Sequence, residues 1–413
     1  MQCQAEANAG LRVGQLLECE VSGLSHDGRG VVALAGSVAF VGGAVPGDRV
    51  RLRLEHRARR HWLARLEAVL EPSAQRCRPA CVLADRCGGC SLQHLELQAQ
   101  RQWKRRQVVD ALQRIAHLPA AEQLVATGIS AGEGLGYRNR ATLPLERRPD
   151  GTLRAGYYRH GSHTLVNVNH CPVLDPRLDQ LVAPLKHDLE SSPWPVDRHL
   201  QAEGGLRHLA LRLGQHSGEL LVTLVSSHGN LPGLERWAER WLQRWPQLVG
   251  VCLNIQDRPT NVLLGPHTEV VAGRGWIEER FAGLSLSIGA DTFFQVNTPM
   301  AEQVVPLLLE GLEGLEPGLL LDAYWFVLLL GIRVGRCLNP VDSHFPEFRA
   351  VNIAYNRHSH DVCCSVGDSQ RHQVTDSVAE IGVATVSHGP VRTHCCVAGG
   401  QCDHDTLGLQ PVD

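Results

Sequence analysis

The chain has 413 residues, of which 43% are hydrophobic and 20% charged, so it is too long for one ordinary domain and too apolar to be disordered throughout. Its net charge of −3 gives no overall signature of nucleic-acid binding. The longest apolar run, Trp325–Leu330, is far shorter than the ~20 residues that span a bilayer, and no signal peptide is evident. We therefore expect a multidomain cytoplasmic protein without a membrane segment.

The first domain is predicted at residues 1–75. Between residues 11 and 70, apolar and polar residues alternate in short runs that are separated by Gly, Pro and Asp. About five short strands at this spacing predict a small, OB-like β-barrel, a fold that often binds nucleic acid.

Two basic clusters follow one another along the chain. The first comprises Arg51, Arg53, Arg57, Arg59 and Arg60, and the second lies on a predicted helix at residues 92–115 and comprises Arg101, Lys104, Arg105 and Arg106. Such clusters are usually solvated faces, and the alternative is a local footprint for phosphate groups.

Residues 76–289 mix strand and helix patterns and are predicted to form a central α/β domain. A hairpin is expected over residues 204–227, with its turn near "GQHSG", and an amphipathic helix in "LPGLERWAERWLQRW". A further helix is expected to start at Thr298 as its N-cap and to lead into the buried strand of "LLLDAY".

The strongest chemical motif is "CVLADRCGGC", which places Cys81, Cys87 and Cys90 in a C-x5-C-x2-C array. Because structural zinc and iron–sulfur clusters take four protein ligands, a fourth donor is needed, and Cys171 in "NHCPVLDP" is the candidate. A zinc ribbon would supply a second C-x2-C pair, which this chain lacks, so the spacing favours a cluster over zinc. Buried free thiols are the alternative, and Cys77 is close enough to compete with Cys81.

These motifs, taken in order, carry a family resemblance. The predicted barrel, "CGGCSLQHL", "GYRNRATLPL", "HCPVLDP", "GGLRHLALR", "TNVLLG", "DTFFQVN" and "LLLDAY" together resemble the RNA uracil-5-methyltransferases, and most closely the branch that modifies 23S rRNA. The likeness runs from about residue 11 to Tyr324. It implies a TRAM domain for the barrel, a [4Fe–4S] cluster held by Cys81, Cys87, Cys90 and Cys171, and contacts of Gln295 and Tyr324 with S-adenosylmethionine.

The chemistry of such an enzyme sets further requirements. Uracil C5 is a weak nucleophile, so a thiolate must add at C6 before the methyl group is transferred, and a general base must then remove the C5 proton. The target base also has to leave the stack. Phe293 and Phe294 are candidates for packing near it, with ordinary core aromatics as the alternative.

The likeness stops at Tyr324. A glycine-rich turn should follow "LLLDAY", but the chain continues as "WFVLLLGIRV", and neither the family's "SCNP" nucleophile motif nor its "HVE" base motif follows. "CLNP" at Cys337–Pro340 comes too soon after Tyr324 to leave room for the intervening βαβ units of ~30 residues each. Residues 341–413 contain two leucines, whereas 250–322 contain thirteen.

We therefore expect residues 290–324 to begin a Rossmann-like methyltransferase domain and residues 325–413 to form an aberrant tail. The simplest explanation is a shift of reading frame near Tyr324, and no catalytic residue is assigned. The predicted function is formation of 5-methyluridine in 23S rRNA, by family. The alternatives are an RNA-binding iron–sulfur protein that has lost catalysis, a tRNA uracil-5-methyltransferase, and a zinc-dependent binder of nucleic acid.

Overall fold

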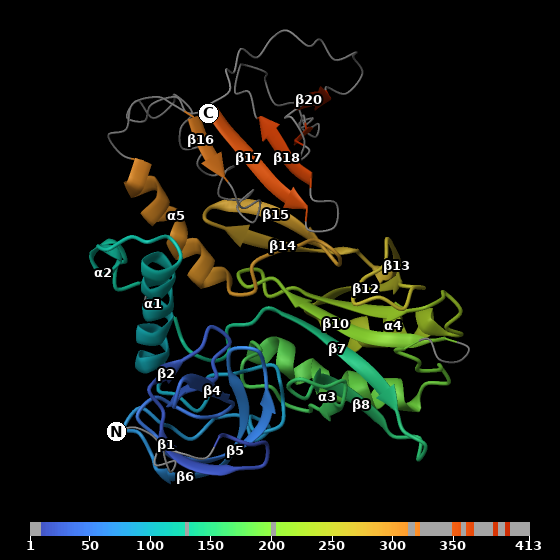
Figure 1. Ribbon diagram of the computed structural model, residues 1–413. Coiled ribbons are helices and arrows are strands. Elements are labelled where there is room, and N and C mark those ends of the chain that lie inside the picture. The colour runs from blue at the N-terminus through green and yellow to red at the C-terminus, as the bar shows by residue number, and fades with distance from the viewer. Residues whose placement is uncertain are drawn as a thin grey trace. The chain divides into compact units, whose positions relative to one another are not determined.

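The computed structural model describes residues 10–128, 132–199 and 204–312 and, beyond them, the backbone of five strands (Figure 1). The chain divides into two compact units. The first comprises Met1–Glu279 and Ser287–Thr298, and the second comprises Arg280–Leu286 and Pro299–Asp413. The described residues of both candidate sites belong to the first unit.

The N-terminal part of the first unit is a six-stranded sheet in the order β1-β5-β6-β4-β3-β2. Its strands are β1 (Leu16–Glu20), β2 (Gly23–Leu24), β3 (Gly30–Leu34), β4 (Ser37–Val41), β5 (Arg49–Arg57) and β6 (Trp62–Glu71). The two edge strands, β1 and β2, are consecutive in the chain, so the sheet curls to bring its ends toward each other (blue in Figure 1). Alternate residues point inward and form one apolar core that includes Leu17, Val32, Val41, Leu52 and Trp62.

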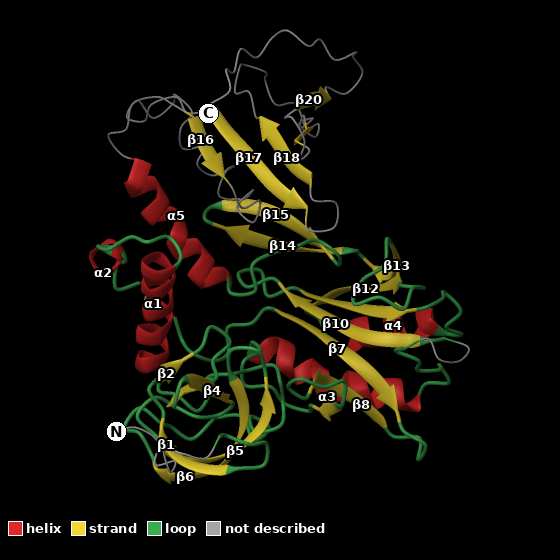
Figure 2. Ribbon diagram, viewed as in Figure 1, coloured by secondary structure: helices red, strands yellow, loops and turns green. Residues whose placement is uncertain are grey.

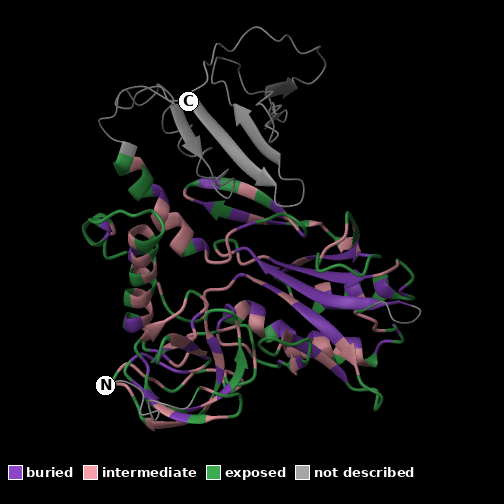
Figure 3. Cartoon of the chain, viewed as in Figure 1, coloured by how far each residue is buried: buried purple, intermediate pink, exposed green. Residues whose placement is uncertain are grey.

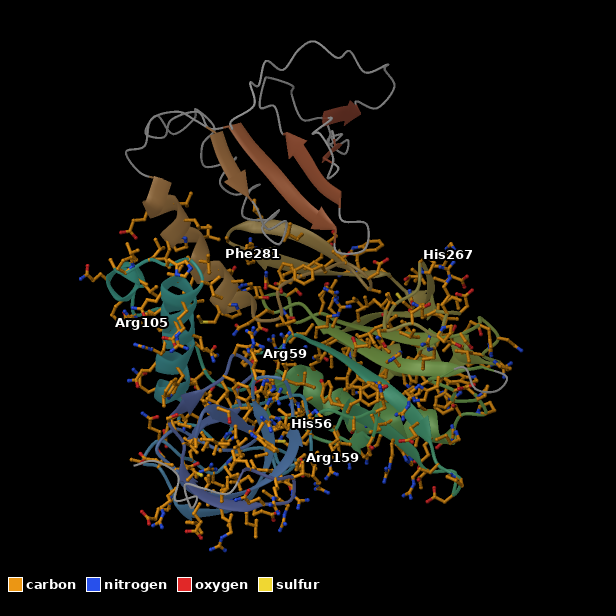
Figure 4. All side chains as sticks on the ribbon, viewed as in Figure 1. His56, Arg59, Arg105, Arg159, His267 and Phe281 are labelled. Carbon is orange, nitrogen blue, oxygen red and sulfur yellow. The ribbon has the colours of Figure 1, made fainter. Side chains whose placement is uncertain are left out.

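The first basic cluster lies on the outer face of this sheet, where carboxylates on neighbouring strands balance much of it. Arg51 of β5 pairs with Glu18 of β1 at 2.6 Å, and Arg53 pairs with Glu67 of β6 at 2.6 Å. Arg57 of β5 lies over the ring of Trp62, 5.6 Å from its centroid, and Arg59 (Figure 4) and Arg60 are exposed in the β5–β6 loop. Cross-strand ion pairs therefore account for two of the five arginines, and the other three lie outside ion pairs within the described part of the chain.

The second basic cluster belongs to α1 (Leu97–Arg114). Arg105 (Figure 4) reaches α2 (Ala121–Leu124), where it pairs with the carboxylate of Glu122 and donates to the carbonyl oxygen of Val125 at 2.8 Å. Arg106 pairs with Asp110 one turn further along α1, at 2.9 Å. The contacts of Arg105 hold α2 against α1, so part of the basic face has a structural role.

The central sheet has seven strands in the order β13-β12-β11-β10-β7-β8-β9 (Figure 2). They are β7 (Arg140–Arg147), β8 (Leu153–Tyr158), β9 (Leu165–Asn167), β10 (Leu206–Leu213), β11 (Leu220–Ser226), β12 (Leu248–Ile255) and β13 (His267–Gly273). Neighbouring strands are antiparallel, except for the parallel pair β11 and β12, which α4 (Leu234–Arg244) connects. The hairpin of β10 and β11 and the helix α4 confirm two of the predicted elements.

One face of this sheet carries the main hydrophobic core. Leucines of β10 and β11 pack with α4 and with α3 (Pro176–Ser191), and the indole N–H of Trp241 donates to Asp188 at 2.9 Å, which joins the two helices. Trp194 lies edge-to-face against Trp237, with ring centroids 6.0 Å apart. Both helices therefore cover the same face.

The opposite face of the central sheet is also buried (purple strands in Figure 3) and mixes polar side chains with apolar ones such as Leu221 and Val225. Because successive side chains alternate between faces, the residues between the core leucines form this second surface. Its buried polar side chains are His208, Arg212, Thr223 and Asn254. Buried polar groups need hydrogen-bond partners, and the loop at Gly265 supplies them for Asn254, whereas Nδ1 of His208 and Nε of Arg212 have none among the described residues.

The rest of the described chain begins with the hairpin of β14 (Trp276–Phe281) and β15 (Leu284–Gly289), which a loop connects to α5 (Thr298–Leu312). α5 begins at Thr298, as predicted. The remaining strands form one sheet in chain order, namely β16 (Leu319–Asp322), β17 (Arg349–Asn356), β18 (Asp361–Val366), β19 (Val383–Val386) and β20 (Thr393–Cys396). Tyr324 and most of the predicted tail lie outside the described residues.

Within this last sheet only β16 and β17 are parallel, and β17 to β20 are antiparallel. A doubly wound sheet would instead add parallel strands through helical crossovers. The described strands after Asp322 therefore do not continue the Rossmann-like pattern expected of a methyltransferase domain. Among the described residues, no helix has the length and apolar character needed to cross a membrane.

Candidate functional site

The four cysteines singled out in the sequence lie around one cavity. Cys81, Cys87 and Cys90 come from the segment that precedes α1, and Cys171 comes from the loop between β9 and α3. Together with Tyr157 and other residues they line a cavity of about 200 Å³. Cys77 does not line it, and its thiol instead donates to the carbonyl oxygen of Gln93 at 3.4 Å.

Backbone contacts hold the first three cysteines in place. The N–H of Gly88 donates to the carbonyl oxygen of Tyr158 at 2.9 Å, and a Cβ on Gly88 would lie only 2.8 Å from the same oxygen. Glycine is therefore required at this position. The N–H groups of Leu83 and Gly89 point at the sulfur atoms of Cys81 and Cys87, each at 3.4 Å, an arrangement that suits thiolate ligands.

The fourth cysteine is held by the start of the central sheet. The N–H of Gly136 donates to the carbonyl oxygen of Pro172 at 2.9 Å, and that of Arg138 donates to Val173 at 3.0 Å. The N–H of Cys171 itself donates to a carboxylate oxygen of Asp179 on α3 at 2.7 Å. The loop of Cys171 is thus held by hydrogen bonds that do not involve the sulfur atom.

Four cysteines around one cavity are a donor set that could hold a metal ion or a cluster. No group of three or more His, Cys, Asp or Glu residues in the described ranges converges closely enough to hold one metal ion. A zinc ion would draw four sulfurs to ~2.3 Å from a common point. Here four thiols surround a cavity, which suits a bulkier group with all-cysteine ligation. Burial raises the pKa of Cys87 and of Cys171, so both are protonated thiols until a metal displaces the proton.

The second predicted site, the loop that carries Gln295, is anchored to the central sheet. The side-chain amide of Asn139, which is 3% exposed, donates to the carbonyl oxygen of Gln295 and to the hydroxyl of Thr298, both at 2.9 Å. The N–H of Asn139 donates to Val296 at 3.0 Å. Arg212 of β10 donates to the carbonyl oxygen of Thr292 at the other end of the loop.

The two phenylalanines of this loop differ in environment. Phe294 is 5% exposed and matches the ordinary core aromatic considered in the sequence analysis. Phe293 is 56% exposed and remains a candidate for contact with a base. Asn139 and Arg212 were not predicted as site residues from the sequence. The feature that could have identified them is a charged or amide side chain within an otherwise apolar strand pattern.

Comparison with known proteins supports a family assignment, although no protein-family model matches the chain. An uncharacterized RNA methyltransferase of Synechocystis is 47% identical over 313 residues, which are 75% of this chain and 67% of the relative. Those of Parasynechococcus marenigrum and Gloeobacter violaceus are 46% and 35% identical, over 77% and 80% of this chain and 68% and 73% of the relatives.

One solved structure shows the same fold. It is a Pyrococcus abyssi tRNA (uracil-54, C5)-methyltransferase in complex with S-adenosyl-L-homocysteine, which matches with a TM-score of 0.54 and 22% identity over 81% of this chain and 78% of that chain. The fold is therefore that of a multidomain methyltransferase. Because these relatives are up to 47% identical to it in sequence, the chain belongs to the RNA methyltransferase family, whose members are enzymes.

Proposed function

We propose that the protein belongs to the S-adenosylmethionine-dependent enzymes that form 5-methyluridine, with 23S rRNA as the substrate. The observation that carries this proposal is the gathering of Cys81, Cys87, Cys90 and Cys171 around one cavity. That ligand set is what the resemblance to the 23S rRNA branch implies. The Pyrococcus neighbour is a tRNA (uracil-54, C5)-methyltransferase, which supports the same chemistry and keeps tRNA as the alternative substrate.

The parts of the site take the following roles in this proposal. The four cysteines hold a [4Fe–4S] cluster, which when bound would cross-link the segment before α1 to the loop before α3. The N-terminal sheet is a TRAM domain that binds RNA, and its exposed Arg59 and Arg60 are suited to contact phosphate groups. Gln295 contacts the cofactor from a loop that Asn139 keeps in position.

The chain as written lacks two catalytic groups that this chemistry requires. Neither a nucleophilic cysteine for C6 nor a base for the C5 proton can be assigned after Tyr324. We therefore propose that the chain as written binds RNA and a cluster but does not transfer methyl groups. A zinc-dependent binder is the remaining alternative, and it would be colourless, whereas an iron–sulfur protein is brown.

Methyl transfer from labelled cofactor tests the function. Unmodified 23S rRNA and tRNA transcripts are incubated with the chain as written and with a version whose codons after Tyr324 are read in another frame. The restored version is expected to form labelled 5-methyluridine in rRNA, and the chain as written is expected to form none. Label in tRNA alone would exclude the rRNA assignment. If no frame encodes a glycine-rich turn and a later "SCNP", the frame-shift explanation is wrong.

Binding of S-adenosylmethionine to the chain as written is expected to be weak or absent. Trp325, Phe326 and Val327 stand where glycines would let the backbone approach the cofactor. The missing ribose-binding carboxylate removes a charged hydrogen bond of ~1.5–3 kcal/mol, which corresponds to roughly tenfold to a hundredfold in affinity. Calorimetric titration measures this, and micromolar binding would show that these bulky residues replace the glycine turn.

A further inference from the structure

Two arginines face each other on the polar side of the central sheet. Arg140 of β7 and Arg212 of β10 are direct partners in the antiparallel register of these strands. Side chains at such positions lie on the same face, with Cβ atoms ~4.5–5.5 Å apart, and like charges placed directly opposite each other are destabilising. Arg212 is only 5% exposed, so water does little to screen this repulsion.

The protein compensates these two charges poorly. Arg212 donates to the carbonyl oxygen of Thr292, but its Nε is buried without a partner. The guanidinium of Arg140 makes no hydrogen bond and no ion pair within the part of the chain that the structure describes. Burial, together with the charge of Arg140, lowers the pKa of Arg212 to about 9. Asp291 opposes this shift but is exposed and does not bond to either arginine.

Two other arginines of the same unit, Arg207 and Arg76, are well bonded. Arg207, on the same strand as Arg212, donates to three backbone carbonyl oxygens, those of Arg198, Gln256 and Arg258. Arg76 is bonded through two nitrogens to the carboxylate of Asp48. The pair of Arg140 and Arg212 therefore differs from Arg76 and Arg207, and polar groups left unsatisfied in this way are expected at functional sites.

We propose that Arg140 and Arg212 form an oxyanion subsite that binds a phosphodiester group of the RNA. The planar guanidinium fork matches the oxygens of a phosphate and forms charge-assisted hydrogen bonds with them. Arg212 also holds Thr292, three residues before Gln295, so the bound phosphate lies beside the loop assigned to the cofactor. This inference rests on the proposed function, because RNA is the source of the phosphate. The carboxylate of the cofactor is also an oxyanion, and the experiment distinguishes it from an RNA phosphate as the group that is bound.

The test replaces Arg140, which is partly exposed and makes no structural hydrogen bond of its side chain. Arg140→Gln is expected to bind a fluorescent fragment of unmodified rRNA about tenfold more weakly at low salt. The slope of log affinity against log salt should fall by about 0.7–0.9, the range for one phosphate contact in single strands and in duplexes. Arg140→Lys keeps the charge and should recover part of the affinity. In RNA-free buffer the melting temperature of Arg140→Gln should equal or exceed that of the wild type, because a repulsion is removed.

Arg244→Gln is the matched control, since it removes the same charge from α4, on the other face of the sheet, where Arg244 is half exposed and lies 3.5 Å from Asp188. It should leave the salt slope unchanged. Equal RNA affinity of Arg140→Gln and wild type would overturn the subsite while leaving the proposed function intact. No RNA binding by the wild type would overturn both. If Arg140→Gln lowers the melting temperature but leaves RNA affinity unchanged, the pair has a structural role only. If Arg140→Gln weakens binding of S-adenosylhomocysteine but not of RNA, the subsite binds the carboxylate of the cofactor.

Discussion

Protein carrying Cys171→Ala is expected to be purified without its iron, whereas Cys77→Ala should keep it. Cys171 lines the cavity with Cys81, Cys87 and Cys90, and a cluster left with three thiolate ligands is labile. Cys77 lies outside the cavity with its thiol bonded to Gln93. Iron content and visible absorbance, measured after anaerobic purification, distinguish the two variants.

Alanine at Cys81, Cys87 or Cys90 should have the same effect as alanine at Cys171, and Cys77→Ala is the matched control because it also removes one partly buried thiol. Equal loss of iron in Cys77→Ala would mean that the ligand set has been assigned wrongly. Stoichiometric zinc with no visible absorbance in the wild type would reject the cluster altogether.

Removing Arg76 is expected to destabilise the N-terminal part of the chain by ~3–5 kcal/mol, the usual cost of leaving one charge of a buried pair uncompensated. Asp48 is fully buried and accepts hydrogen bonds from Arg76 at 2.5 Å and from the N–H groups of Val45 and Ser73. Urea unfolding of Arg76→Ala and wild type measures the difference. Arg49→Ala removes an exposed arginine that pairs with Glu71, and it should cost at most ~1 kcal/mol. Equal losses in the two variants would contradict this account.

The effect of Arg76 should also depend on pH. Burial alone would raise the pKa of Asp48, but the hydrogen bonds from Arg76, Ser73 and Val45 outweigh it and hold that pKa below its usual value. A carboxyl with a lowered pKa stabilises the folded state fully above its unfolded pKa of ~3.9, and this contribution is lost as the pH falls through the folded value. Without Arg76, the pKa of Asp48 in the variant should lie above its wild-type value, because burial is then opposed only by Ser73 and Val45. The gap in unfolding free energy between wild type and Arg76→Ala should therefore be widest near neutral pH and narrow as the pH falls through the pKa of Asp48 in the variant. A gap that stays constant to pH 3 would exclude Asp48 as its source.

Local patterns predicted most of the elements. The alternation in β1 to β6, the turn of the β10–β11 hairpin and the amphipathic face of α4 are all set by residues near one another in the chain, and each was found close to its expected place. Cys171 was different. It lies far from Cys81 in the sequence, so the need for a fourth donor made it a candidate and the family resemblance supported the choice, but no local pattern places it beside the other three.

Contacts that depend on strand register could not be predicted. Arg51 and Arg53 read as a basic cluster, but Glu18 stands opposite Arg51 on β1, and Glu67 lies on β6 two residues from the residue opposite Arg53. Arg140 and Arg212 read as isolated charges, and their pairing follows from the register of β7 and β10. A shift of one residue would send each side chain to the other face, so no local pattern contains this information.

The backbone bonds that fix Cys171 bear on the order in which the protein is assembled. Gly136, Arg138 and Asp179 hold the loop of Cys171 through contacts that form as the central sheet and α3 form. The segment that carries Cys81, Cys87 and Cys90 is held in the same way, by the bond from Gly88 to Tyr158. None of these bonds uses a sulfur atom, so all four thiols would be brought together by folding alone. If the proposed cluster is bound, its insertion would then be a late step on a finished scaffold.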